Sequence, residues 1–299
     1  LVGSEMCIRD RTRAIENAQK RVEENNFGIR KRLLEYDDVM NKQRTYIYSR
    51  RHHALLGERV GIDIANMLYD TIENIVNTYD QPTDYDDMSL ELLCVLTLEP
   101  PFSEEEFRNM SKEEMVETLY ETANAALQRK SDRITEIAMP VIKDWVENRG
   151  ANGRIAVPIT DGKRIFNLVV DITEAYNTQC RSIVKEWHKA ILLVTIDELW
   201  KEHLRELDQL RQSVQNASYE QKDPLVIYKV ESFHLFEAML NTLNVKSMSA
   251  LMRGQIYVQE RQASASSATL ESEGRQAAGG QPEVKRAMPE RPNDYSRYK

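Results

Sequence analysis

Two short stretches of the sequence hold residue types that could bind a metal ion or exchange protons. They are the acidic run at positions 35–38 and the pair His52-His53. On a helix, neighbouring side chains point about 100° apart, so Asp37 and Asp38 do not face one ion together, and no second set of ligands follows one turn later. The same geometry separates the two histidines. We therefore interpret both stretches as solvated helix surface and expect no catalytic residue and no metal site.

The sequence also lacks the motifs that bind nucleotides. It contains no G-x-x-x-x-G-K-[ST] loop, no apolar strand that ends in paired acids and no parallel-sheet pattern. Cys7, Cys94 and Cys180 show neither CxxC nor CxC spacing, which argues against a disulfide framework and a zinc site and fits a reducing cytosol. We therefore expect no cofactor on this chain and no ATP hydrolysis by this chain alone.

The composition indicates a mainly α-helical chain of one or two domains. Of its 299 residues, 29% are charged, and only 11 are Gly and 9 are Pro. No run of about 18 apolar residues is present, so we expect no segment that crosses a membrane. The net charge of −8 argues against a dedicated nucleic-acid binder.

Residues 183–257 carry two helical patterns joined by a short polar loop. The first pattern repeats apolar residues at helical spacing; they are Ile183, Trp187, Ile191, Val194, Leu199, Leu207, Leu210 and Val214. Asp223-Pro224 restarts a helix after the loop at 216–222, because Asp caps free N–H groups and Pro suits the first helical position. The second pattern holds Val226, Val230, Phe233, Phe236, Leu240 and Leu243. Two helices of roughly 33 residues would make a hairpin about 50 Å long.

Another long helix is predicted over residues 11–56. Apolar residues repeat along it every seven positions without an interrupting Pro: Ile15, Val22, Ile29 and Tyr36. The stretch is locally basic, with twelve Lys/Arg against seven Asp/Glu between positions 9 and 51. Gly28 costs about 1 kcal/mol relative to Ala in a helix interior, which suggests a kink there or the close approach of another element.

Further helices are predicted over residues 62–79 and 119–148. Between them lies an acidic stretch, residues 80–121, with thirteen Asp/Glu against two Lys/Arg. Two pairs in this stretch have the spacing of a capping box: Ser103 with Glu106, and Ser111 with Glu114. A charged stretch of this kind most often keeps a surface soluble.

Residues 151–172 give the one convincing β signal. The β-branched runs at 155–159 and 165–170 flank Asp161-Gly162, which is typical hairpin turn chemistry. Pro158 has no amide hydrogen, so we expect its strand at a sheet edge. Because an isolated two-stranded hairpin is marginal in water, we expect it to pack on a helix.

Two groups of motifs resemble the SecA family, the motor ATPases of bacterial protein export. Residues 195–204, 210–212, 219–224, 228–229 and 231–233 are similar to its two-helix finger. Residues 18–23, 26–31, 34–40 and 43–44 are similar to the long helix of its helical scaffold. The two groups occur in the family's order and cover about a third of the chain.

The resemblance implies a mainly α fold with a long scaffold helix, a helical wing bundle and a long antiparallel helical hairpin. The β-hairpin is not part of the family pattern, so we interpret it as one small insertion, and the composition of the last residues predicts a disordered tail. The expected parts are 1–10, a non-family scar excluded from fold reasoning; 11–58, the scaffold helix; 59–150, the wing; 151–172, the β-hairpin insertion; 173–258, the scaffold return and finger; and 259–299, a disordered linker. The linker is rich in Ala, Ser, Gly, Gln and Pro and has no apolar periodicity.

The resemblance places function in the finger loop. Tyr219 matches the bulky residue that contacts the translocating polypeptide, and an aromatic ring suits sequence-tolerant apolar contact. Lys222 beside it could contact backbone carbonyls or channel loops. Trp200 and His203 are expected to pack between finger and scaffold, which in the family also restrains the ATPase.

The resemblance also implies partners, cofactors and a location. Expected partners are the SecYEG channel, the preprotein, the motor domains of the same protein, an anionic lipid surface and a second copy in a homodimer, but no nucleic acid. ATP and Mg belong to the whole parent protein, and the Cys/His zinc module of many relatives is absent from this sequence. The location would be cytoplasmic and peripheral, on the inner face of the bacterial cell membrane. The alternative is a helical coiled-coil adaptor with no export role, which would need only the heptads and the charged surface.

Overall fold

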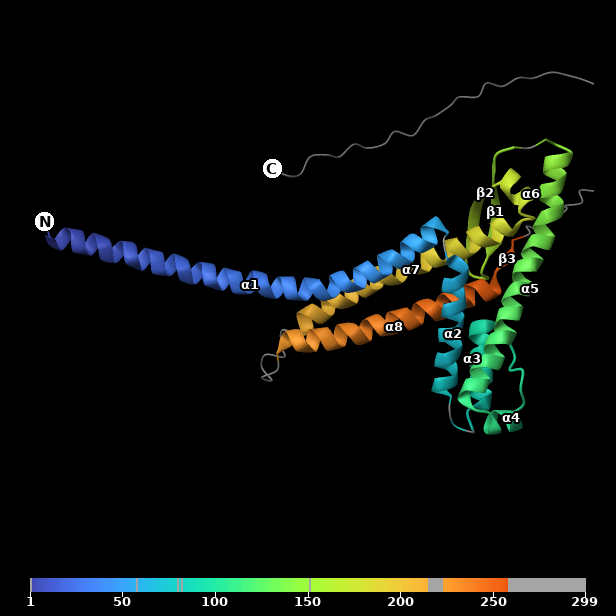
Figure 1. Ribbon diagram of the computed structural model, residues 1–299, viewed down its shortest axis with the longest axis horizontal. Coiled ribbons are helices and arrows are strands. Elements are labelled where there is room, and N and C mark those ends of the chain that lie inside the picture. The colour runs from blue at the N-terminus through green and yellow to red at the C-terminus, as the bar shows by residue number, and fades with distance from the viewer. Residues whose placement is uncertain are drawn as a thin grey trace, which may run out of the picture. The chain divides into compact units, whose positions relative to one another are not determined.

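The computed structural model describes residues 2–57, 59–79, 81, 83–150, 152–214 and 223–257, and the side chains from residue 8 onward. Its elements are α1 (Val2–Leu56), α2 (Val60–Thr78), α3 (Tyr85–Leu96), α4 (Glu104–Asn109), α5 (Lys112–Glu147), β1 (Arg154–Thr160), β2 (Ile165–Asp171), α6 (Ile172–Asn177), α7 (Arg181–Ser213), α8 (Pro224–Arg253) and β3 (Gln255–Ile256) (Figure 1). The mainly α prediction is confirmed. The predicted disordered linker lies outside the described residues.

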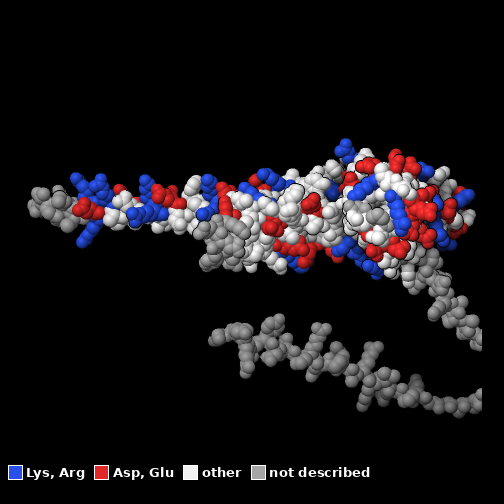
Figure 2. All heavy atoms as spheres, turned by 90° about the horizontal axis from the view of Figure 1, so that it is seen from below, with Lys and Arg blue, Asp and Glu red and all other residues white. Residues whose placement is uncertain are grey.

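The helix α1 has two halves with different surroundings. Every side chain over residues 8–34 is exposed, and contacts with α7 and α8 begin near Tyr36. The predicted heptad residues of the first half are therefore uncovered, with both Ile15 and Val22 59% exposed. Charged side chains of both signs lie along the same half (Figure 2).

The helix α1 differs from the prediction at its start and at Gly28. It begins at Val2 and not near Arg11. No atom outside the local helix lies within 4 Å of a Cβ built on Gly28, so among the described residues no other element approaches this glycine closely.

The helices α2, α4 and α5 follow the predicted pattern, whereas α3 lies in the acidic stretch, where no helix was predicted before Ser103. Both capping boxes are present: each serine hydroxyl accepts from the backbone N–H three residues on, and each glutamate accepts from the serine N–H. Ser103 thereby begins α4 and Ser111 begins α5. A helix start satisfied in this way is worth about 1 kcal/mol relative to alanine at the cap.

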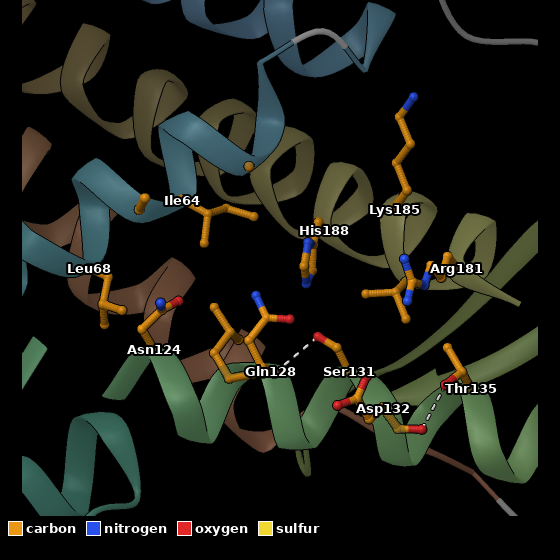
Figure 3. Close-up of a pocket in the computed structure, with 14 residues that line it drawn as sticks. Ile64, Leu68, Asn124, Gln128, Ser131, Asp132, Thr135, Arg181, Lys185 and His188 are labelled. Carbon is orange, nitrogen blue, oxygen red and sulfur yellow. Dashed lines mark hydrogen bonds between the residues drawn. The ribbon is translucent and has the colours of Figure 1, made fainter. Parts of the chain in front are cut away.

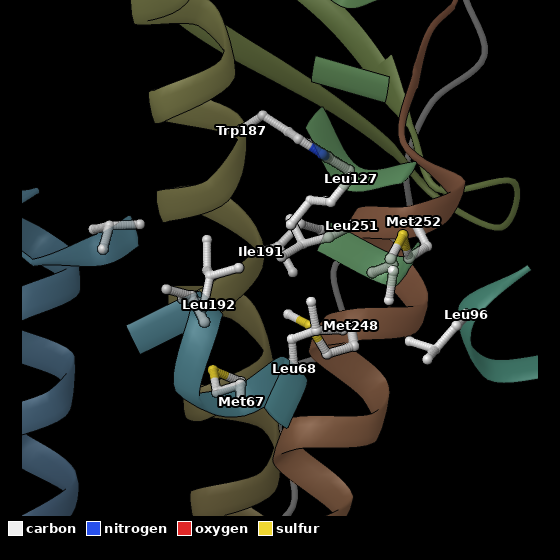
Figure 4. Packing of buried hydrophobic residues seen from close by; sticks show 14 of the residues in the cluster. Met67, Leu68, Leu96, Leu127, Trp187, Ile191, Leu192, Met248, Leu251 and Met252 are labelled. Carbon is white, nitrogen blue, oxygen red and sulfur yellow. The ribbon is translucent and has the colours of Figure 1, made fainter. Parts of the chain in front are cut away.

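The hydrophobic core lies where α2, α3, α5, α7 and α8 meet (Figure 4). Its labelled members in Figure 4 come from all five helices: Met67, Leu68, Leu96, Leu127, Trp187, Ile191, Leu192, Met248, Leu251 and Met252. The helices α2, α3 and α5 and the end of the α7–α8 pair near Trp187 and Met248 therefore share one core.

The sheet has three strands in the order β2-β1-β3, so the expectation of an edge position for Pro158 is wrong. The strand β1 pairs with β2 on one side and with β3 on the other. The carbonyl of Pro158 accepts a hydrogen bond from Tyr257 N–H, at 2.9 Å, where the two-residue β3 ends. Pro158 thus still accepts a hydrogen bond in this central strand, although its nitrogen cannot donate one.

The turn of the hairpin is organised by Asp161. Its carboxylate accepts from the N–H groups of Lys163 and Arg164, at 2.9 and 2.6 Å, and Gly162 adopts φ of 86°. Burial alone would raise the pKa of Asp161, but these N–H groups outweigh it and lower the pKa. The Asp-Gly signal thus predicts the turn correctly, since both residues are used by it.

The second long helix of the hairpin is shorter than predicted. It ends at Arg253, and the residues up to Tyr257 turn away as β3. Gly254 makes the change of direction beside Trp187, whose Nε1 lies 2.6 Å from the position of a Cβ built on the glycine. A side chain at this position would collide with the indole ring.

Candidate functional site at the scaffold and finger helices

The loop between α7 and α8 holds Tyr219 and Lys222, which lie outside the described residues. The residues that follow the loop, from Asp223 onward, are described. Asp223 Oδ1 accepts from Leu225 N–H at 3.0 Å, and Pro224 occupies the start of α8. The predicted helix start at Asp223-Pro224 is confirmed. The helix α8 therefore begins with a capped N-terminus immediately after Lys222.

A buried hydrogen-bond chain ties α1 to both helices of the hairpin. Gln43 of α1 donates through Nε2 to the carbonyl of Ser232 in α8, at 3.0 Å. Its Oε1 lies 2.9 Å from Nε2 of His203 in α7. Because the amide of Gln43 already donates on one side, its oxygen accepts from the Nε2–H of His203. One glutamine therefore links three helices.

His203 is held in its neutral form. Its side chain is 1% exposed, and its Nδ1 has no partner in the described part of the chain. Burial lowers its pKa from the ordinary value to about 4, because the charged imidazolium would lose its hydration. At neutral pH this histidine is a structural donor and does not carry charge.

Trp200 lies one turn before His203 and packs against α1. Its ring meets Tyr48 edge-on, with centroids 6.4 Å apart, and its side chain is buried. Beside it, Arg51 of α1 forms a two-pronged pair with Asp197 of α7, at 2.7 and 3.0 Å. The hydrogen bond to Asp197 raises the pKa of Arg51. Aromatic packing and a charge pair therefore fix α1 on α7 here.

A groove of about 610 Å³ lies over this contact between α1 and α7. It is lined by Ile47, Tyr48, Arg51, His52, Leu55, Ile196, Asp197, Trp200, Lys201 and Leu204. Its only acid is already paired, and no group of three metal-ligating side chains occurs in the described ranges. These side chains can hold helices together but form no arrangement for general acid–base work.

The helix α8 leaves part of its apolar stripe uncovered near the loop. Val226, Val230 and Phe233 recur at four- and three-residue spacing and are 56%, 49% and 60% exposed. Farther along, Leu243 of the same predicted stripe is buried. The loop end of the hairpin thus presents an apolar face, whereas its base is enclosed in the core.

A match to the family described as SecA Wing and Scaffold domain covers residues 9–255. The chain belongs to the SecA family. Similar relatives are the protein translocase subunits SecA of Parabacteroides distasonis, 49% identical, Bacteroides thetaiotaomicron, 52% identical, and Bacteroides fragilis, 50% identical. Each alignment covers 96% of this chain but only 25–27% of the relative. The chain therefore spans about a quarter of the length of these curated relatives, and the match gives no support to a coiled-coil adaptor.

Of the residues named from the SecA motifs, Trp200 and His203 of α7 contact Tyr48 and Gln43 of α1, and Tyr219 and Lys222 are outside the described residues. The roles given to these four residues stay predictions. Gln43, Arg51 and Ser232 were assigned no role from the sequence. Gln43 stands 160 residues from His203, and a single sequence contains no local signal for a partner at that distance.

Proposed function

We propose that this chain forms the scaffold, wing and finger of a protein-export motor, in which ATP hydrolysis by the whole protein drives preproteins through the Sec channel. The observation that carries the proposal is the match of residues 9–255 to the SecA wing and scaffold family. About half of the residues are identical to those of translocase subunits along nearly the whole chain.

The first half of α1 would dock on the motor domains of the same protein. Support comes from its uncovered apolar residues, including Ile15, Val22 and Ile29, on a helix that is charged elsewhere. Burying three such side chains would stabilise the contact by several kcal/mol, since each is worth roughly 1.5–3 kcal/mol. ATP and Mg would bind to those motor domains.

The finger would contact the moving polypeptide through Tyr219 and Lys222. Support comes from the adjoining apolar face of Val226, Val230 and Phe233, which continues the surface toward the loop. Aromatic and aliphatic side chains can contact extended chains of many sequences, because their attraction does not depend on a fixed hydrogen-bond pattern.

The buried chain of Gln43, His203 and Ser232 would hold the finger at a fixed angle to the scaffold. A rigid contact of this kind would let movement of α1 reach the loop, and with Trp200 it would restrain the motor. The proposed location is the cytoplasm and the inner membrane face, with SecYEG and anionic lipid as partners. In the described part of the chain, no helix is long and apolar enough to cross a membrane.

The test is a chimera in which residues 9–255 replace the matching segment of the Bacteroides thetaiotaomicron relative. We expect ATP-dependent transport of a preprotein into channel-containing vesicles. Tyr219→Ala should reduce the transport rate about tenfold, because the apolar contact with the substrate is lost. Tyr69→Ala is the matched control, since Tyr69 is an exposed tyrosine of α2. If the Tyr219→Ala chimera transported the preprotein at the same rate as the unaltered chimera, Tyr219 would have no role in transport.

A further inference from the structure

A pocket of about 350 Å³ opens where α2, α5 and α7 meet (Figure 3). It lies at the beginning of α7, more than ten residues before Trp200 and His203, and is separate from the groove described above. Its size falls within the range of small-molecule pockets, roughly 300–1,000 Å³. No step of the proposed transport function uses it.

One wall of the pocket is apolar. Ile64 and Leu68 of α2, Leu127 of α5 and Val184 of α7 are all buried and line it. In Figure 3, Ile64 faces the space between α2 and α5. This wall can accept a ring or a short aliphatic chain, because it offers contact from three helices.

The facing wall carries polar side chains with free hydrogen-bonding capacity. In the described part of the chain, six of them form no side-chain hydrogen bond or ion pair: Asn124, Gln128, Asp132, Arg181, Lys185 and His188. Five of the six are exposed to solvent, and His188 is half-buried. A concave cluster that leaves six of them unpaired can bind a polar molecule without first breaking internal bonds.

His188 is directed into the pocket. Figure 3 shows its imidazole pointing from α7 toward Gln128 and Ser131 of α5. Burial lowers its pKa to about 4, so the ring is neutral at pH 7 and can donate from one nitrogen and accept on the other. It can therefore bind a polar group of a ligand without adding charge.

One basic side chain of the lining can bind an anionic group. Lys185 extends away from the pocket toward the turn after α1, where its Cε lies 2.9 Å from a Cβ built on Gly57 (Figure 3). Arg181 is therefore the basic group that a ligand would meet, and Asp132 is the one acid of the lining. An arginine binds a carboxylate with two parallel hydrogen bonds. A group with two negative charges would be repelled by Asp132.

We propose that this pocket binds a small amphipathic monoanion, an organic carboxylate with an apolar ring or short chain. Arg181 would bind the carboxylate, the amides of Asn124 and Gln128 with His188 would bind further polar atoms, and the apolar wall would hold the ring. The ligand would touch α5 and α7 together. Its binding would stabilise the contact between wing and scaffold, by the general rule that a ligand favours the state that binds it.

The test uses para-trifluoromethylbenzoate as the probe and fluorine NMR line width as the measurement, on the 299-residue chain. The uncharged para-trifluoromethylbenzyl alcohol has nearly the same shape. We expect the benzoate to bind about tenfold more tightly than the alcohol. Arg181→Gln should abolish this difference, because Arg181 supplies the partner of the carboxylate. Lys130→Gln, an exposed change on α5 outside the lining, should preserve it.

A second variant separates binding in the pocket from binding elsewhere. Ala65→Phe adds a ring to the lining and should displace the probe, with helicity checked by circular dichroism. If Ala65→Phe does not fold, the test rests on Arg181→Gln. That variant should fold, because Arg181 is exposed. Equal affinity for benzoate and alcohol, unchanged binding in Arg181→Gln or no broadening at about 5 mM probe would each overturn the proposal.

Discussion

At the residue scale, the contact of α1 with α7 and α8 depends on a histidine that must stay neutral. His203 is buried against Gln43, and Trp200 and Phe236 contact its ring. An imidazolium here would have no carboxylate to face among its described partners. The state of one buried ring therefore affects how three helices are held together.

We predict that His203 makes stability fall as the pH falls from about 6.5 toward 4. Its folded pKa, about 4, lies below the ordinary value of 6.5, so the unfolded chain binds more protons in this window. The loss should be on the order of 2 kcal/mol at pH 5. His188 shifts in the same direction and adds to the total.

The measurement is urea unfolding at pH 7 and at pH 5. His203→Gln retains a donor toward Gln43 without a titrating ring, so its stability should fall less between the two pH values. His234→Gln is the control, because His234 lies exposed on α8. An identical pH dependence in His203→Gln and the parent chain would contradict the account.

At the element scale, the end of α8 depends on the absence of a side chain at Gly254. Its φ of −55° is open to any residue, so the requirement for glycine is steric. A Cβ there would lie 2.6 Å from Nε1 and 3.0 Å from Cε2 of Trp187. The indole is itself part of the core, so it has little room to move.

We predict that Gly254→Ala destabilises the chain by about 1–3 kcal/mol, the usual cost of overpacking. Trp187→Phe should reduce the effect of Gly254→Ala in the double variant, because the smaller ring leaves space. Gly61→Ala is the matched control, since nothing lies within 4 Å of a Cβ at that helical glycine. Equal unfolding midpoints for Gly254→Ala and the parent chain would contradict the prediction, because they would show that the Trp187 ring can move aside without loss of stability.

The sequence predicts these elements well where the signal is local. Helical periodicity, the capping boxes and the Asp-Gly turn depend on residues a few positions apart, and all were found. The strand β3 was missed because two residues after a helix carry no alternation pattern, and their pairing with β1 is set by tertiary structure. The link from Gln43 to Ser232 was missed for the same reason, since the two residues are 189 positions apart.

At the scale of the whole molecule, the apolar patterns predict more burial than this chain supplies. Ile15 and Val22 of α1 repeat as regularly as buried helix faces do, and Val226 and Phe233 of α8 do the same. A pattern shows that a face is suited to burial but does not identify what covers it. The chain matches only about a quarter of the length of its relatives, and under the proposed function the motor domains would cover the face of α1.

We predict that the combined change Ile15→Ser, Val22→Ser and Ile29→Ser abolishes binding to the rest of the Bacteroides thetaiotaomicron relative. The fold should persist, because these side chains are more than half exposed. Analytical ultracentrifugation of the two pieces measures the association. Serine at Ile62, Leu90 and Leu93, exposed residues outside α1, is the control. Full association of the first variant would place the docking surface elsewhere.

The central claim is that the loop between α7 and α8 contacts the transported polypeptide. The most direct measurement places a photo-crosslinking residue at position 219 of the chimera and drives it with ATP, a stalled preprotein and channel-containing membranes. The account predicts adducts with the preprotein or the channel, which disappear when the crosslinker is moved to position 69 of α2. Adducts only within the chain, alongside normal preprotein movement, would contradict it.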